Sequence, residues 1–382
     1  MRKPLPTTAV RKVAVIAHSA RSLRRYRGGL MRELAARRHR VLAMAPDVDD
    51  ALAAEFGTVN IQTAAFPLEQ QSAGPFAARR TDKAIGEALK AFGPHVVVTS
   101  GPRTAMLGAT LGRSAGAERV VLVVNGLAAL GVDGDAPSGW LQGSGVKRRR
   151  KAAIAAADML VFHNPDDPRT LMAEETMPAD KPFVVTAGSG VDLAHYAMAP
   201  LPPLAGGLVF VMLARLAAGQ GVLTFAEAAA TLKPKAQAAR FVLAGLPSTE
   251  PDVVTPQHLA RWPGAIEVVP SAADVRPLIT AAHVLVHPSR NEGLPGAVLE
   301  GLAMGRPIIA SDIPGSRLAI DERVNGVLVP PGDADALAAA MESFLRRPDL
   351  IPAMSRASRA KAERLFDERT VVATMLQALG LQ

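Results

Sequence analysis

The chain has 382 residues, of which 49% are hydrophobic and 20% charged, a composition typical of well-packed globular proteins and not of disordered or fibrous ones. It contains no cysteine, which excludes disulfides and thiol chemistry and fits a reducing cytoplasm. No apolar run reaches the roughly 18 residues of a membrane-spanning helix, and the N-terminal residues carry prolines and charges. The sequence therefore predicts neither a membrane span nor a signal peptide.

The formal net charge of +8 favours an anionic partner: nucleic acid, an acidic membrane surface or a phosphorylated ligand. Basic residues crowd the first predicted strand–helix unit, and a second run spans Lys147–Lys151. The arginines of the first group are Arg21, Arg24, Arg25, Arg27, Arg32, Arg37, Arg38 and Arg40. Only 4% of residues are aromatic, so stacking platforms for single-stranded nucleic acid are scarce and we expect no nucleic-acid partner.

Six short, β-branched runs in the first half are bounded by Gly, Pro, Asn or charged residues, which is typical of buried parallel strands. They are Val13–Ala17, Val41–Ala45, Val96–Thr99, Val120–Val124, Met159–Phe162 and Phe183–Thr186. Helical stretches separate them. Gly29–Arg38 places Leu30 and Leu34 on one face, and Asn164-Pro165 predicts an N-cap followed by proline in the first helical turn.

The second half repeats this alternation after Tyr196–Gly207, where prolines and glycines interrupt all periodicity. The predicted strands are Leu208–Leu213, Phe241–Ala244, Ile266–Val269, Val284–His287, Ile308–Ala310 and Val327–Val329. The predicted helices lie near Val222–Thr231, Val275–Ala282, Gly296–Met304 and Ala334–Arg346, with a last helix after Phe366.

This alternation predicts an α/β protein with two Rossmann-like, doubly wound parallel sheets. We expect an N-terminal domain over residues 11–200, a C-terminal domain over 201–365, and a helix over 366–382 that packs back on the first domain. Open α/β sheets bind ligands at the carboxyl ends of their strands. Two such domains facing each other predict a site in the cleft between them.

The most informative segment is PSRNEGLPGAVLE, from Pro288 to Glu300. A strand ending at His287 leads through a glycine-bearing loop into a helix begun by Pro295. The free N–H groups of a helix N-terminus attract anions. Because proline has no N–H, the expected donors are Gly293, Leu294, Gly296 and Ala297.

Glu292 lies beside this predicted anion site, and Glu300 lies about a turn further into the helix. Carboxylates are unfavourable next to an anion unless they accept hydrogen bonds, and sugar and ribose hydroxyls are the obvious donors. For either Glu alone, an ordinary solvent-facing helix position is the alternative. The thirteen-residue constellation as a whole favours a site for a phosphorylated sugar.

A second constellation places Arg215 at the carboxyl end of a strand, before a glycine turn and a helix. An arginine there can fork onto phosphate oxygens and neutralise a diphosphate leaving group, although a surface arginine is the alternative. Arg27-Gly28-Gly29 follows the first strand, where glycines let backbone approach a ligand, but a double glycine is more often only a turn.

Several motifs are missing from the sequence. It has no P-loop, no G-x-G-x-x-G after the first strand and no zinc-binding cluster, so we expect neither a dinucleotide cofactor nor a metal. Asp133-Gly134-Asp135 has the form of a metal-binding D-x-D but lacks a preceding strand, and we interpret it as loop. We interpret His163 and His287, at strand ends, as structural.

The chain resembles a retaining glycosyltransferase of the GT-B fold, family four. The E-x7-E motif of the family matches Glu292 and Glu300, and GSGVDL, ARL…G and GRPIIASDIPGSR…NGVLVPPGD match in order, from Lys12 to about Phe366. The segments YRGGL, VFHNPDD and EGLP look most like a subgroup that adds N-acetylhexosamine or related sugars. Its acceptors are undecaprenyl-diphosphate-linked, in capsule, O-antigen or glycoprotein-glycan assembly.

The resemblance implies that Glu292 contacts donor-sugar hydroxyls, that Glu300 contacts the ribose and that Arg215 holds the diphosphate. A Gly28-Gly29 loop would approach the diphosphate from the N-terminal domain. The family needs no metal and no cofactor beyond its nucleotide-sugar co-substrate, and the leaving phosphate is thought to help deprotonate the acceptor hydroxyl.

The sequence departs from the family at three places. Gln220 stands where the family pairs its arginine with a lysine, so a neutral amide replaces one cation at the diphosphate. Arg103-Thr104 replaces a lysine-proline pair of the subgroup, which makes Arg103 the candidate to restore that cation. Arg317-Leu318 stands where the family often has Arg-Glu.

The leading prediction is a glycosyltransferase that uses a nucleotide-diphosphate donor, expected to be UDP-linked and of N-acetylhexosamine type, and a polyprenyl-linked or other envelope glycan acceptor. Its basic N-terminal domain would rest on the inner face of the cytoplasmic membrane. Two alternatives stay open. One is a same-fold epimerase, which the E-x7-E spacing disfavours. The other is a weakly active or inactive nucleotide-sugar-binding partner subunit of an envelope assembly, which Gln220 favours.

Overall fold

A computed structural model of the chain describes residues 9–68, 74–131, 140–247, 252–261, 263–270, 274–290 and 292–382. The predicted Asp133-Gly134-Asp135 loop and Asn291 lie outside these residues. The chain folds into two compact units. The first consists of Met1–Ser189 together with Glu368–Gln382, and the second of Gly190–Asp367.

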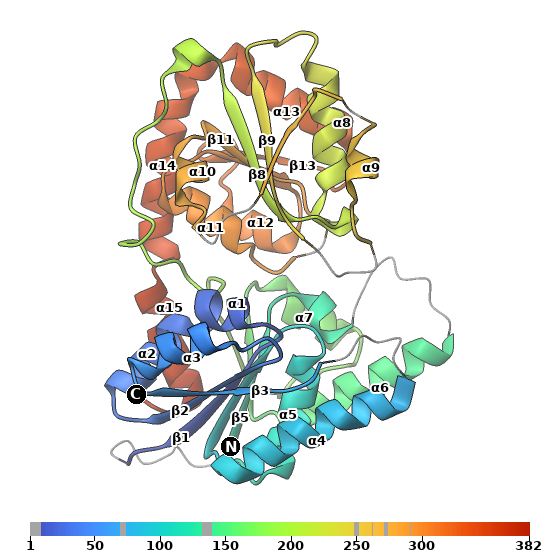
Figure 1. The fold of residues 1–382 in the computed structure, drawn as a ribbon, viewed down its shortest axis with the longest axis vertical. Coiled ribbons are helices and arrows are strands. Elements are labelled where there is room, and N and C mark those ends of the chain that lie inside the picture. The colour runs from blue at the N-terminus through green and yellow to red at the C-terminus, as the bar shows by residue number, and fades with distance from the viewer. Residues whose placement is uncertain are drawn as a thin grey trace. The chain divides into compact units, whose positions relative to one another are not determined.

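The first unit is built on a seven-stranded parallel sheet in the order β3-β2-β1-β4-β5-β6-β7, of which Figure 1 labels β1, β2, β3 and β5. The strands are β1 (Lys12–Ile16), β2 (Arg40–Ala45), β3 (Ile61–Ala65), β4 (Val96–Ser100), β5 (Arg119–Val124), β6 (Met159–Phe162) and β7 (Phe183–Val185). The central strands are buried apolar runs, as expected for a sheet covered on both faces.

Helices cover both faces of the first sheet. One core joins the strands to α2 (Gly28–Ala36), α3 (Asp50–Gly57) and the final helix α15 (Glu368–Leu379). The other core joins them to α4 (Gly74–Phe92), α5 (Thr104–Ser114), α6 (Trp140–Ala156) and α7 (Asp166–Ala173). Short helical segments complete the unit: α1 (Ala20–Ser22), the π-helix η1 (Leu23–Arg27) and η3 (Leu127–Leu130). The cap expected at the start of α7 is present, since Asn164 Oδ1 accepts hydrogen bonds from the N–H groups of Asp166 and Asp167.

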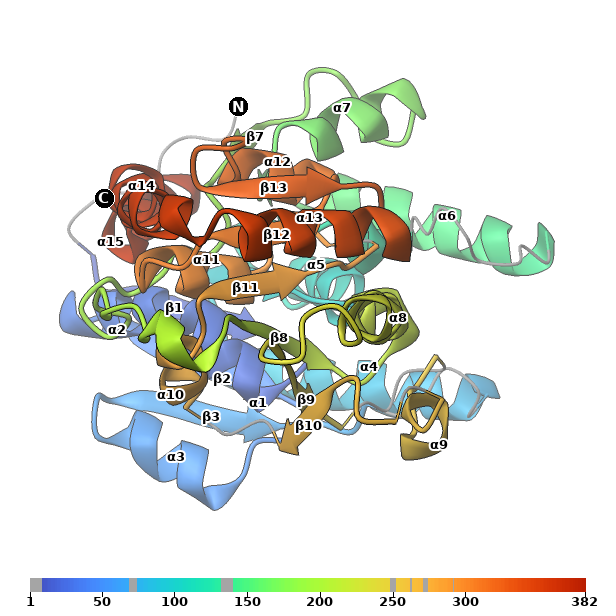
Figure 2. The same cartoon turned by 90° about the horizontal axis from the view of Figure 1, so that it is seen from above.

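The second unit has a six-stranded parallel sheet in the order β10-β9-β8-β11-β12-β13, and Figure 2 shows β13, β12, β11 and β8 following one another across it. The strands are β8 (Val209–Arg215), β9 (Arg240–Leu246), β10 (Glu267–Pro270), β11 (Val284–His287), β12 (Ile308–Ser311) and β13 (Gly326–Val329). The predicted fold class, two parallel α/β sheets followed by a C-terminal helix, is confirmed.

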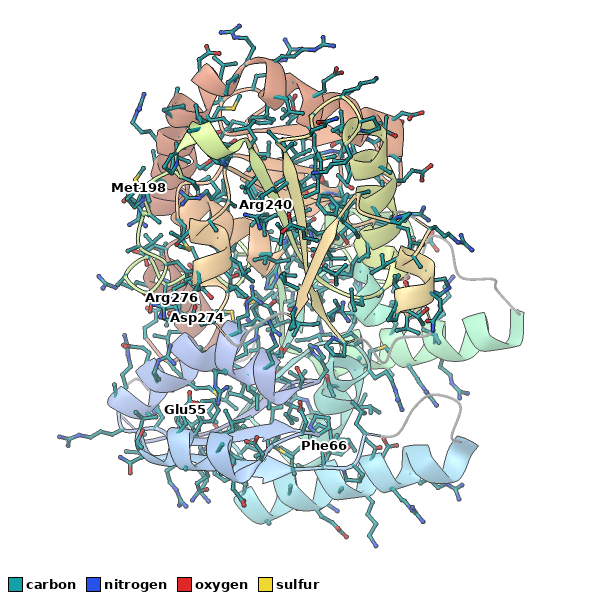
Figure 3. All side chains as sticks on the ribbon, turned by 45° about the horizontal axis from the view of Figure 1, so that its top comes forward. Glu55, Phe66, Met198, Arg240, Asp274 and Arg276 are labelled. Carbon is teal, nitrogen blue, oxygen red and sulfur yellow. The ribbon has the colours of Figure 1, made fainter. Side chains whose placement is uncertain are left out.

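The helices of the second unit are α8 (Val222–Leu232), α9 (Pro256–Leu259), α10 (Arg276–Thr280), α11 (Gly296–Ala303), α12 (Pro314–Ala319), α13 (Ala334–Arg346) and α14 (Ile351–Leu365), with short turns η4 (Leu204–Gly206), η5 (Ala218–Gln220) and η6 (Pro348–Leu350). α8 and α13 pack on one face through Phe225, Met341 and Phe344. Surface ion pairs such as Arg240–Glu267 and Arg276–Asp274 (Figure 3) are solvated and contribute little.

The segment preceding β8 is fixed to the second unit by Arg306, which is fully buried. All five guanidinium N–H groups find carbonyl oxygens, those of Ile279, Ala199, Met304, Pro200 and Thr280. Burial lowers the pKa of Arg306 to about 10.

The structure divides into its two units at residues 189 and 367. The expected domain limits at residues 200 and 365 differ slightly from these and stay predictions. No helix among the described residues combines the length and apolarity needed to cross a bilayer.

Candidate functional site

Three predicted site residues follow two paired strands of the second sheet. Arg215 is the exposed last residue of β8, Gln220 ends the turn η5, and Glu292 lies between β11 and α11. β8 and β11 pair in parallel, so both carboxyl ends meet at the same edge of the sheet. This is the edge at which open α/β sheets bind ligands.

Glu292 is held at both carboxylate oxygens. Gln220 Nε2 donates a hydrogen bond to Oε1 at 2.7 Å, and His287 Nε2 lies 3.0 Å from Oε2. The Glu292 side chain is 23% exposed, so it still reaches solvent. A carboxylate offers about four lone-pair positions, so two remain for a ligand.

The charge of Glu292 is stabilised by its neighbours. Burial alone raises the pKa of Glu292, but the charge of His287, the hydrogen bonds from His287 and Gln220, and the charge of Arg215 together outweigh it. The net result is a pKa below the usual value for Glu. Glu292 is therefore an ionised acceptor at neutral pH.

The contact between His287 and Glu292 was not predicted from the sequence. It was expected to be structural, and it is indeed buried, but its Nε2 contacts Glu292 directly. Its Nδ1 has no hydrogen-bond partner within the described residues. The available signal was its position at the carboxyl end of a strand, five residues before Glu292.

The start of α11 offers backbone donors beside Glu292. Pro295 occupies the N-cap position without a side-chain cap. In the described part of the chain, no acceptor takes the N–H groups of the four expected donors, Gly293, Leu294, Gly296 and Ala297. α12 packs directly on this loop, because a Cβ at Gly315 would lie 1.2 Å from the carbonyl oxygen of Gly293. Glycine at position 315 therefore allows the loop to take its shape.

Glu300 lies inside α11 and is buried. α11 approaches the sheet closely, since a Cβ at Gly301 would lie 2.9 Å from Ile308 and 3.1 Å from Leu285. The structure thus places Glu292 in the loop and Glu300 in the helix that the loop enters, as the spacing predicted. That Glu300 contacts a ribose stays a prediction.

Gly28 and Gly29 do not form a loop, so the expectation of a Gly28-Gly29 loop is wrong. Both residues open α2, directly after the π-helix η1. A Cβ at Gly29 would lie 2.4 Å from the carboxyl carbon of Glu368 at the start of α15. The absence of a side chain at Gly29 therefore serves helix packing within the first unit. A ligand contact of this pair stays a prediction.

Arg103 follows β4 and adopts φ 62°, ψ −49°. Thr104 N donates to Pro102 O at 2.7 Å, which makes this a γ-turn of the rare kind with positive φ. Such a backbone costs about 1–3 kcal/mol and persists where surrounding contacts impose it, commonly at ligand sites. Here Thr104 Oγ1 donates to Ser100 O at 2.6 Å and fixes the turn. The strain is consistent with a positioned Arg103, whose ligand role stays a prediction.

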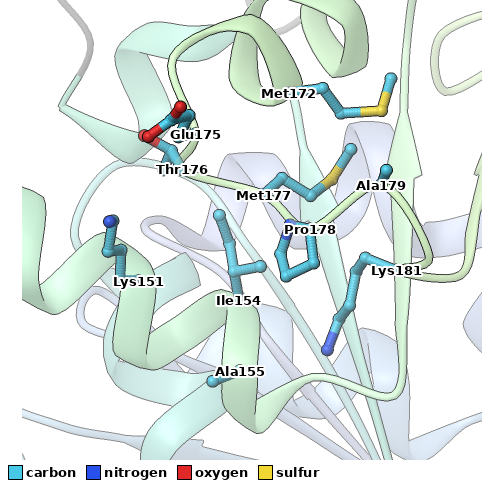
Figure 4. A pocket seen from close by; sticks show the side chains of 10 residues that line it. All are labelled: Lys151, Ile154, Ala155, Met172, Glu175, Thr176, Met177, Pro178, Ala179 and Lys181. Carbon is cyan, nitrogen blue, oxygen red and sulfur yellow. The ribbon is translucent and has the colours of Figure 1, made fainter.

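A pocket of about 440 Å³ lies elsewhere in the first unit, between the end of α6 and the segment after α7 (Figure 4). Lys151, Met177 and Lys181 are among its lining residues. These segments precede β6 and β7, so the pocket lies at the amino ends of the strands, away from the predicted ligand edge. Among the described residues, no cluster of His, Asp or Glu could hold a metal ion.

Part of the chain is similar to a family of known proteins. Residues 207–347 match the family model described as glycosyl transferases group 1. The putative glycosyltransferase EpsD of Bacillus subtilis is 38% identical over 148 residues, which is 38% of each chain. The putative colanic acid biosynthesis glycosyltransferase WcaL of Escherichia coli is 28% identical over 209 residues, 51% of each chain. The matches thus span about half or less of these relatives.

Solved structures share the fold over almost the whole chain. Sucrose-phosphate synthase from Thermosynechococcus elongatus superposes with a TM-score of 0.76 at 18% identity, covering 96% of this chain and 98% of that one. Anabaena Alr3699/HepE in complex with UDP superposes with a TM-score of 0.72 at 17% identity, covering 97% and 100%. These similarities confirm the predicted GT-B fold.

Proposed function

We propose that the protein transfers a sugar from a nucleotide-diphosphate donor with retention of configuration and without a metal. Support comes from the match of residues 207–347 to the group 1 glycosyltransferase model in a chain of GT-B fold. The proposed donor is UDP-linked and of N-acetylhexosamine type. The proposed acceptor is undecaprenyl-diphosphate-linked or another envelope glycan. One relative, from Campylobacter jejuni, is named as an N-acetylgalactosaminyltransferase acting on a diphospho-undecaprenol and is 34% identical over 119 residues, 31% of this chain and 30% of that one.

The observation that carries the proposal is the arrangement around Glu292. An ionised carboxylate, held by Gln220 and His287, lies just before the start of α11, whose first N–H groups have no acceptor within the part of the chain that the structure describes. The N–H groups suit diphosphate oxygens, and the two remaining lone-pair positions of Glu292 suit sugar hydroxyls. A sugar diphosphate presents both kinds of group at adjacent positions.

In the proposed reaction, negative charge develops on the leaving diphosphate. Arg215 and the N–H groups of Gly293 and Gly296 would stabilise that charge. Glu292 would orient the sugar by accepting hydrogen bonds from its hydroxyls. The leaving phosphate would take the proton of the acceptor hydroxyl on the face from which it departs.

Gln220 has a role here that differs from that of a lysine. Its amide already donates to Glu292, so at most one further N–H reaches the diphosphate. The side chain thus orients the sugar-binding carboxylate more than it neutralises the leaving group. This favours the second candidate function, a weakly active or inactive nucleotide-sugar-binding partner subunit.

We further propose that the protein works in the cytoplasm, on the inner face of the cytoplasmic membrane. Lys147, Arg148 and Arg149 are exposed on α6. Each basic residue near an anionic leaflet contributes about 1 kcal/mol to binding. Such attachment would bring the enzyme to a polyprenyl-linked acceptor.

A panel of UDP- and GDP-sugars, assayed for donor hydrolysis and for transfer to a polyprenyl-diphosphate glycan, tests the proposal. Glu292→Ala should lower transfer by at least ~100-fold, because the sugar loses its orienting acceptor, while thermal stability changes little. The matched control is Glu322→Ala, which removes an exposed glutamate of the same unit from the turn before β13 and should leave transfer unchanged. Full transfer by Glu292→Ala would contradict the assigned role. Donor binding without turnover in the unmodified protein would select the partner-subunit function.

A further inference from the structure

Arg27, the last residue of the π-helix η1, is a buried cation to which the proposed reaction assigns no role. Its side chain is 3% exposed. A single π-helical turn is rare and is frequently found at functional sites. In the described chain, no carboxylate forms an ion pair with Arg27.

The partners of Arg27 are all neutral. Nη2 donates to Asn125 Oδ1 at 3.0 Å, and Nη1 donates to Tyr26 O at 3.0 Å and to Ser189 Oγ at 3.3 Å. Nε is buried and has no partner among the described residues. His163 adds no second positive charge, because burial and the nearby Arg27 lower its pKa to about 3. A buried positive charge is thus left without a counter-charge, which is costly unless an anion binds.

The position of Arg27 suits a ligand of the first sheet. Asn125 directly follows β5, and Ser189 follows β7 as the last residue of the first unit before the chain enters the second. The guanidinium therefore connects the carboxyl ends of these strands, which is the ligand-binding edge of an open α/β sheet.

We infer that Arg27, Asn125 and Ser189 form a binding site for a phosphoryl group. The fork of Nε and one Nη matches two oxygens of one phosphate. The 3.3 Å contact with Ser189 is long, so a charged oxygen would replace it with a shorter, stronger hydrogen bond. Ser189 would then release Nη1 of Arg27, and Asn125 would keep the guanidinium in place.

The phosphate has two possible sources, the diphosphate of the donor and that of a lipid-linked acceptor. The shared chemistry is a diphosphate, and the two sources are separated by the probe. The assignment of the phosphate to a donor or an acceptor rests on the proposed function. The binding of a phosphoryl group at Arg27 does not, because binding requires no sugar transfer.

The test is calorimetric titration of the full-length protein with inorganic pyrophosphate, UDP and farnesyl diphosphate. Arg27→Gln should weaken pyrophosphate binding about tenfold or more, since hydrogen bonds to a charged group are lost. The matched control is Arg24→Gln, on the same π-helix, whose exposed side chain pairs with Glu55 (labelled in Figure 3) and whose loss should change affinity less than about twofold. A parallel loss for UDP assigns the site to the donor, and a loss for farnesyl diphosphate alone assigns it to the acceptor.

Two further variants keep the inference testable if Arg27→Gln does not fold. Arg27→Lys keeps the charge but not the fork and should give intermediate pyrophosphate affinity. Ser189→Ala removes the hydroxyl that competes with phosphate for Nη1 of Arg27. This variant should bind pyrophosphate at least as tightly as the unmodified protein. Unchanged pyrophosphate binding in Arg27→Lys and in any folded Arg27→Gln, or a tenfold loss in Ser189→Ala, would overturn the inference.

The second-unit site is followed separately through Arg215→Gln. If that variant loses UDP while Arg27→Gln binds every probe normally, the proposed function stands and the phosphoryl site is refuted. If no nucleotide binds but Arg27→Gln still loses pyrophosphate, the phosphoryl site stands and the proposed function is refuted.

Discussion

The two most deeply buried arginines among the described residues, Arg306 and Arg27, use their hydrogen-bonding groups differently. Arg306, in the second unit, donates all five N–H groups to main-chain carbonyls. Arg27, in the first unit, donates to three neutral acceptors, and its Nε has no partner among the described residues. Burial lowers the pKa of both to about 10, so burial does not distinguish them. The difference lies in hydrogen bonding, which marks Arg306 as structural and leaves Arg27 available to a ligand.

Acidic groups at the ligand edges of the two sheets show the same contrast. Glu292 has a partner at each oxygen, and its pKa is lowered. Asp167, in the first turn of α7, is buried with no partner for Oδ2 among the described residues. Burial, followed by the charge of Asp166, raises the pKa of Asp167 to about 6. The Glu292 carboxylate is thus preorganised by internal hydrogen bonds, whereas the Asp167 carboxylate keeps one oxygen without a partner among the described residues.

The largest expected effect is that of Arg306→Met. Several buried carbonyl oxygens would lose their donors at once, and the free energy of unfolding should fall by about 4 kcal/mol. Urea denaturation of the purified protein measures this change. A loss below about 1 kcal/mol would show that the carbonyl contacts of Arg306 are not a structural requirement.

The next effect concerns Asp167 and pH. The pKa of Asp167 in the native state exceeds the ordinary value of 3.8, so the native state binds the Asp167 proton more tightly than the unfolded state does. The stability that this proton contributes is lost as the pH rises from about 4 through 6. Asp167→Asn has no proton to lose, so its stability should not fall in this way. The variant should match the parent protein near pH 4 and exceed its stability at pH 7 by up to about 3 kcal/mol. Thermal unfolding across this range gives the comparison, and parallel profiles would contradict it.

Arg27→Met should change the free energy of unfolding by no more than about 1 kcal/mol. The charge that it removes has no ionic partner in the described part of the chain, and replacing buried ionic groups by apolar ones is often neutral or stabilising. Urea denaturation of this variant alongside Arg306→Met measures the two changes in the free energy of unfolding under the same conditions. Equal destabilisation by the two substitutions would remove the distinction between them.

The smallest expected effect is that of Gln220→Lys on UDP affinity. A lysine adds a positive charge between Glu292 and the proposed diphosphate position, and it should tighten UDP binding about fivefold. Calorimetric titration resolves this change. An unchanged affinity would mean that position 220 acts only on Glu292.

Apolar runs made much of the fold predictable from the sequence. Strands such as Val284–His287 are buried on both faces and read as continuous hydrophobic segments. The edge strand β3 escaped prediction because Gln62 and Thr63 interrupt its apolar character. α14 was also missed. Its buried positions include Ser355, Ser358 and Lys361, so the apolar stripe that marks a helix is weak.

The candidate site was predictable where one segment contains the whole pattern, as with Glu292 and the N–H donors that follow it. The contacts of Glu292 with His287 and Gln220 depend on how two loops meet at the sheet edge, and spacing alone does not give them. The same limit applies to Arg27. Its partners Asn125 and Ser189 are 98 and 162 residues away in the chain, so only the fold reveals that the guanidinium is buried among neutral groups.

The central claim is that a sugar diphosphate binds where β11 leads into α11. A crystal structure of the protein with UDP tests it most directly. We expect diphosphate oxygens within about 3 Å of the N–H groups of Gly293, Leu294, Gly296 and Ala297, with Arg215 on the same phosphates and Glu292 facing the sugar position. UDP bound elsewhere, or a Glu292 carboxylate directed away from the nucleotide, would contradict it.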